Sequence, residues 1–76
     1  MDLKIGIARG GQVIEVELAD DADRVAIRKQ IEAALSGADS VFWVTDKKGK
    51  ELAVATSSIA FVQLGSDDSR SIGFGA

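Results

Sequence analysis

Toward its end the chain carries the run Ile59-Ala60-Phe61-Val62-Gln63-Leu64. A strand with one face in water alternates apolar and polar residues, whereas this run has almost no polar break, so it predicts a β-strand covered on both faces. Gly65 and a polar turn follow, and after them comes the segment Arg70-Ser71-Ile72-Gly73-Phe74-Gly75. Because this segment places an aromatic residue between two glycines, we expect the tail over residues 66–76 to be ordered, with Phe74 against an apolar surface.

Alternating residues at the start of the chain predict a β-hairpin. Apolar side chains occupy every second position from Leu3 to Ile7 and again from Ile14 to Leu18, which is the period of a half-buried strand. The intervening Arg9-Gly10-Gly11-Gln12 supplies the glycines that a tight turn with positive φ angles requires.

A helix of about four turns is predicted to follow this hairpin. The acidic residues Asp20, Asp21 and Asp23 can cap free backbone N–H groups, and we favour this role over a cation site. An apolar stripe with helical period is formed by Ile27, Ile31, Ala34 and Leu35. Gly37, directly after Ser36, is typical of a helix end. The remaining polar side chains are expected to face solvent, namely Arg24, Arg28, Lys29, Gln30 and Glu32.

Three more strands are predicted after the helix, at residues 41–45, 52–55 and 59–64. The element order ββαβββ predicts one small α+β domain over residues 1–76, built in two layers. We expect a five-stranded, mainly antiparallel sheet with one helix on one face. The last three strands are expected to form a meander beside the first hairpin, with the fifth strand antiparallel to the first.

Composition excludes several functions. The 76 residues contain no cysteine and no histidine, which excludes disulfides, thiolate or imidazole metal sites and histidine-based catalytic triads. A net charge of −3 argues against a general nucleic-acid binder. Because the N-terminal residues form no signal-peptide hydrophobic region and no apolar run is long enough to span a membrane, we expect neither feature. We therefore expect a cytoplasmic protein that is not an enzyme, with no catalytic residues, no bound metal, no cofactor and no membrane partner.

One helix covers only part of one face of such a sheet, whereas the last three strands are apolar on both faces. Large exposed apolar patches mark interfaces, so the second face is expected to meet another subunit, in preference to the chain's own tail. The leading prediction is a non-catalytic, self-associating interaction module, with a homodimer favoured and a different protein partner also possible. The predicted contact residues are Val41, Trp43, Val62, Leu64, Ile72 and Phe74.

The alternative prediction is a nucleotide- or anion-binding protein. Its candidate residues are Arg9, Lys47, Lys48 and Lys50, which lie in two turns near glycines and carry positive charge. Turn chemistry alone explains the same residues, and no phosphate-binding loop motif is present.

Four segments of the chain resemble one known family. They are Leu3-Lys4-Ile5-Gly6-Ile7, Thr45-Asp46-x-x-Gly49, Ile59-Ala60-Phe61-Val62-Gln63-Leu64-Gly65 and Arg70-x-Ile72-Gly73-Phe74-Gly75. They are similar to short actinobacterial proteins grouped as the domain of unknown function three-one-zero-seven. The resemblance implies a cytosolic protein and supplies no catalytic residues. Some members carry the description ATP-binding, which matches the alternative prediction.

The element order also resembles the β-grasp architecture of ubiquitin and the sulfur carriers. Those carriers end in Gly-Gly, whereas this chain ends Gly73-Phe74-Gly75-Ala76. A β-grasp also pairs its first and last strands in parallel, whereas the strand count here predicts an antiparallel pair. A carrier role is therefore the least favoured of the three functions.

Overall fold

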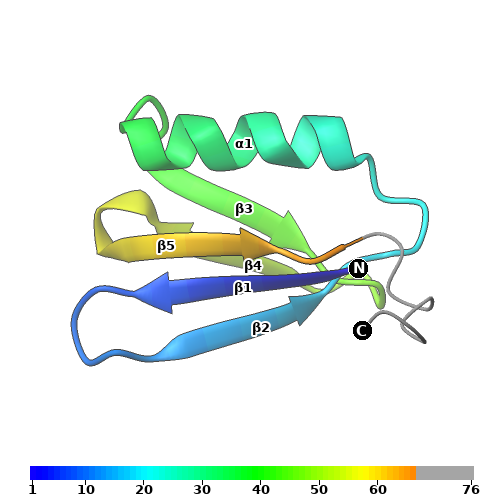
Figure 1. Ribbon diagram of the computed structural model, residues 1–76, viewed down its shortest axis with the longest axis horizontal. Coiled ribbons are helices and arrows are strands. Elements are labelled where there is room, and N and C mark those ends of the chain that lie inside the picture. The colour runs from blue at the N-terminus through cyan, green and yellow to red at the C-terminus, as the bar shows by residue number, and fades with distance from the viewer. Residues whose placement is uncertain (67–76) are drawn as a thin grey trace.

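The computed structural model describes residues 1–66, which contain five strands, one α-helix and one 3₁₀ turn (Figure 1). The predicted tail, with Ile72 and Phe74, falls largely in residues 67–76, outside the described residues. The elements, in chain order, are β1 (Asp2–Ile7), β2 (Val13–Glu17), α1 (Arg24–Ser36), β3 (Val41–Thr45), β4 (Glu51–Ala55), η1 (Thr56–Ser58) and β5 (Ile59–Leu64).

The strands form two antiparallel sheets, one with the order β2-β1-β5 and one with β3-β4. The predicted α+β class and ββαβββ order are therefore confirmed, but the single five-stranded sheet and the meander of the last three strands are wrong. The 3₁₀ turn η1 separates β4 from β5, and β5 pairs with β1, with Val62 opposite Ile5. This pair is antiparallel, as the strand count predicts and unlike a β-grasp.

The core lies between the two sheets and α1. Figure 1 shows the helix running along the side where β3 and β5 lie, and α1 contacts both of these strands. Leu3 and Ile5 of β1 are fully buried at the centre. The other buried side chains come from β2 and the segment after it, α1, β3 and β4: Val16, Leu18, Ile31, Ala34, Phe42, Val44 and Val54.

Both ends of α1 are set by the residues that the sequence indicates. The Asp23 carboxylate accepts hydrogen bonds from the N–H groups of Val25 and Ala26, each at 3.1 Å, so its role as helix cap is confirmed. Gly37 ends the helix with φ 85°, a conformation that favours glycine. The apolar stripe is narrower than predicted, since Ile31 and Ala34 are buried whereas Leu35 is 51% exposed.

No helix among the described residues is long and apolar enough to cross a membrane.

Candidate functional site

The outer side of the β3–β4 hairpin is an exposed apolar surface, which we call the Trp43 face. It consists of Val41 and Trp43 on β3 and their register partners Ala55 and Ala53 on β4. The next pair on this side, Thr45 and Glu51, is polar and bounds the apolar surface. Successive side chains of a strand point to opposite sides, so the intervening Phe42 is buried in the core while Trp43 is turned outward. Trp43 is 58% exposed, a large fraction for the only tryptophan of the chain.

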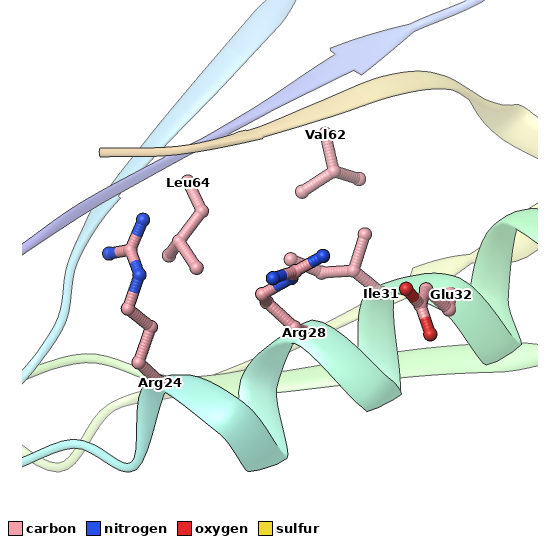
Figure 2. Close-up of a pocket in the computed structure, with 6 residues that line it drawn as sticks. All are labelled: Arg24, Arg28, Ile31, Glu32, Val62 and Leu64. Atoms are coloured by element: carbon pink, nitrogen blue, oxygen red, sulfur yellow. The ribbon is translucent and has the colours of Figure 1, made fainter. Parts of the chain in front are cut away.

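The other predicted contact residues do not lie on the Trp43 face. Val62 and Leu64 belong to the other sheet, opposite the fully buried Ile5 and Leu3, and their half-buried side chains point toward α1 (Figure 2). The predicted contact surface assumed that the last three strands lie side by side. This assumption is wrong, because β5 pairs with β1. Ile72 and Phe74 lie outside the described residues.

Phe61 lies on the outward-facing side of β5, as does Gln63. It lies opposite Gly6, where a Cβ atom would overlap the aromatic ring. The ring therefore covers the backbone of the central strand β1, a known way for an aromatic side chain to compensate a glycine in a sheet. Phe61 is still 46% exposed, but the neighbouring row on this side holds the ion pair between Lys4 and Glu15, at 3.9 Å, so this face is mixed rather than apolar.

The four cations proposed for anion binding are divided between two ends of the fold. Arg9 lies in the β1–β2 turn, whereas the three lysines lie in the β3–β4 turn at the other end of the long axis (Figure 1). The backbone N–H of Lys47 donates to the carbonyl of Glu17, the last residue of β2, at 2.8 Å, which fixes this separation by the full length of that strand. The sequence set therefore does not form one site.

The lysine turn is built around carboxylates. The Nζ of Lys47 lies 3.3 Å from the carboxylate of Glu17. The Asp46 carboxylate accepts hydrogen bonds from the backbone N–H groups of Lys48, at 2.9 Å, and Lys50, at 2.8 Å. Gly49 completes the turn with φ 88°. The pKa of Asp46 lies below its ordinary value of 3.8, and the largest cause is the hydrogen bond from the backbone N–H of Lys50. Desolvation acts in the opposite direction, whereas the backbone N–H of Lys48 and the charges of both lysines lower the pKa further. One of the three lysines is thus paired with a carboxylate, and a second carboxylate lies within the turn itself.

We expect the Asp46→Ala variant to lose part of the acid sensitivity of the protein. A carboxylate with a lowered pKa adds stability above its unfolded-state pKa, and this contribution disappears as the pH falls through the lower folded-state value. Thermal unfolding followed by circular dichroism between pH 5 and pH 2 should therefore show a smaller decrease in the variant than in the wild type. Asp21→Ala is the matched control, and an equal decrease in Asp46→Ala and wild type would contradict the assignment.

A groove of about 370 Å³ lies between α1 and β5 (Figure 2). We call it the α1–β5 groove. It is lined by residues of both elements: Arg24, Arg28, Ile31, Glu32, Val62 and Leu64.

The two arginines of the groove differ in their contacts. Arg24 donates to the carbonyl oxygen of Gly65 at 2.6 Å and lies 3.7 Å from the sulfur of Met1, so it is partly buried rather than solvent-facing as predicted. Arg28 is exposed and forms no hydrogen bond or ion pair with any other residue between 1 and 66. The sequence predicts that the two arginines share one helix face, because they are four residues apart. No local pattern in the sequence predicts that β5 lies opposite this face.

The comparison with known proteins agrees with the resemblance noted in the sequence. No curated protein matches the chain. The model of one family matches residues 1–75, and that family is described as Protein of unknown function (DUF3107). The match covers almost all of the 76 residues. The chain therefore belongs to this family.

Proposed function

We propose that this protein is a non-catalytic, cytoplasmic interaction module that associates with a second copy of itself through the Trp43 face. The observation that carries the proposal is the exposure of Trp43, at 58%, on the apolar Trp43 face. Tryptophan is the residue type most enriched among those that dominate binding energy at interfaces.

The composition of the Trp43 face favours a second copy as the partner. Ala53 lies directly opposite Trp43, and Ala55 lies opposite Val41. A large ring thus lies beside a shallow area formed by two small side chains. In a two-fold arrangement each copy supplies both features, so the indole of one copy can lie over the alanines of the other.

The size of the chain gives a second reason. A domain of fewer than about 80 residues usually obtains only about 3–5 kcal/mol from its core, and association is one of the ways in which such domains gain stability. Within residues 1–66, the side of the β3–β4 hairpin that carries Trp43 is covered by no other element of the fold. Covering it in a dimer would remove apolar surface from water without changing the core.

The alternative function, binding of a nucleotide or another anion, has less support. Arg9 lies at the opposite end of β2 from Lys47, Lys48 and Lys50, and the lysine turn already holds the carboxylates of Glu17 and Asp46. A phosphate approaching this turn would meet those two negative charges. The α1–β5 groove offers a more open positive charge, because Arg28 is exposed and lies in no ion pair with residues 1–66.

Sedimentation velocity of the full chain tests the proposed self-association. At micromolar concentration we expect a species with twice the 8.0 kDa mass of the chain, which dissociates on dilution. A single monomeric species throughout the micromolar range would overturn the proposal. Titration with ATP by calorimetry tests the alternative function, which predicts heat of binding.

A further inference from the structure

The strand β5 has one free edge. It is the last strand in the order β2-β1-β5, so only one of its sides is paired. The N–H of Gly65 donates to the carbonyl of Asp2 at 2.7 Å, so Asp2 and Gly65 form a hydrogen-bonded pair. Along an antiparallel ladder, such pairs alternate with pairs whose backbone groups point away from the partner strand. Phe61 and Gln63 therefore bond to β1, whereas Val62 and Leu64 direct their backbone N–H and C=O groups away from it. No residue between 1 and 66 partners these outward groups.

This edge lacks the features that usually prevent strand pairing. Sheet edges are commonly protected by charged side chains, by proline or by short length. β5 contains no charged residue and no proline over Ile59–Leu64, and it is the longest of the strands at a sheet edge. By contrast, β2 carries Glu15 and Glu17, and β4 carries Glu51. A row of open hydrogen-bonding groups on an uncharged strand is a template for another extended chain.

The charge beside this edge indicates what kind of chain fits it. Arg24 and Arg28 extend from α1 toward β5 and lie near Leu64 and Val62 (Figure 2). Arg28 has no carboxylate partner among residues 1–66, and an exposed guanidinium binds carboxylates through paired, charge-assisted hydrogen bonds. Glu32 lies one further turn along the helix, so the excess positive charge is at the N-terminal half of the groove.

We propose that the free edge of β5 and the α1–β5 groove form a binding site for an extended acidic segment of a partner protein. The segment adds as a strand beside β5 and exchanges hydrogen bonds with the backbone of Val62 and Leu64. Its side chains alternate, so every second one faces α1, and acidic residues at those positions meet Arg28 and Arg24. A second copy of this chain fits the edge less well, because β5-to-β5 pairing would bring like-charged arginines of both copies to one junction.

This site is distinct from the Trp43 face, since the two surfaces lie on different sheets. The two proposals can therefore fail independently. A dimer formed through the Trp43 face would leave both α1–β5 grooves available, which gives one acidic segment per subunit.

A fluorescein-labelled peptide of sequence Thr-Glu-Val-Glu-Val-Glu-Val-Thr is a suitable probe, with the full-length protein in fluorescence anisotropy titrations. We expect saturable binding, and loss of binding when lysine replaces each glutamate of the peptide. Two modified versions of this peptide test the backbone contacts: one carries N-methyl groups on the valine amides, the other on the glutamate amides. An added strand donates only every second backbone N–H to β5, so one of the two N-methylated peptides must lose binding although its side chains are unchanged.

Variants of the protein locate the site. Arg28→Glu is expected to weaken binding by about tenfold or more, as is typical for a lost charge-assisted contact that becomes repulsive. Lys29→Glu makes the same charge change on the same helix but outside the groove, and should weaken binding by much less. Trp43→Asp should leave peptide binding unchanged, whatever its effect on self-association.

Amide hydrogen exchange identifies the edge directly. In the free protein we expect fast exchange at Val62 and Leu64 and slow exchange at Phe61 and Gln63, and addition of the peptide should slow exchange at the first pair. Protection of Val62 and Leu64 in the free protein would show that residues 67–76 or a second copy already occupies the edge, and would overturn the proposal. Equal binding of both N-methylated peptides, or equal effects of Arg28→Glu and Lys29→Glu, would also overturn it.

Discussion

Replacing Ile5 with alanine is expected to remove most of the stability of the protein. Ile5 is fully buried at the centre of β1, with Ile14 opposite it on β2 and Val62 opposite it on β5. Truncating a buried isoleucine to alanine costs about 2–5 kcal/mol, because apolar contact is lost and a cavity remains. A domain of this size holds only about 3–5 kcal/mol from its core, so the variant should be partly unfolded without denaturant.

Urea unfolding followed by circular dichroism, at one fixed protein concentration, measures this effect. Ile5→Val should cost about 1 kcal/mol, since only one methylene group is removed. Val13→Ala is the matched control on the same sheet, because Val13 is 49% exposed and its truncation should change stability by less than about 0.5 kcal/mol. Similar midpoints for Ile5→Ala and Val13→Ala would contradict the assignment of Ile5 to the core.

The second large effect concerns association rather than folding. Trp43→Asp is expected to raise the dissociation constant of the proposed dimer by about 30-fold or more, which corresponds to the loss of about 2 kcal/mol typical of a dominant interface residue. The aspartate would also bring a charge into an apolar contact. Because Trp43 is 58% exposed in the single chain, the fold and the circular dichroism spectrum should be preserved.

Sedimentation velocity over a dilution series measures the dissociation constant of each variant. Ala53→Arg tests the surface on which the indole is expected to lie, and it should dissociate the dimer as Trp43→Asp does. Val13→Asp introduces the same acid at an apolar residue of the other sheet that is also about half exposed, and it should leave the dimer intact. A dimer that survives both Trp43→Asp and Ala53→Arg would place the contact elsewhere.

The features that the sequence predicted correctly depend on residues close to one another in the chain. Gly10 and Gly11 have φ angles of 89° and 65° in the predicted turn, and Asp23 and Gly37 set the predicted helix ends. Each of these depends on a backbone conformation or a hydrogen bond within a few residues. Alternation over β3 also predicted that Val41 and Trp43 share one face, although it did not indicate which face of the strand is exposed.

The sheet arrangement required information that no local pattern carries. The uncharged run of β5 is compatible with pairing to β4 or to β1, and only the packing of the whole chain selects β1. This single choice moved Val62 and Leu64 from the predicted outer surface to the groove beside α1. It also changed the interpretation of Arg28, whose position on the helix was predictable but whose neighbours were not.

The antiparallel pairing of β1 with β5 has a mechanical consequence. Asp2 and Gly65 lie opposite each other, so both ends of the described chain leave the sheet at the same corner, where Arg24 contacts Met1 and Gly65. A force that pulls these ends apart acts on the ladder at one end and breaks its hydrogen bonds one after another. Folds whose first and last strands are parallel load all those bonds at once in shear. This protein should therefore yield at low force, by peeling β5 from β1.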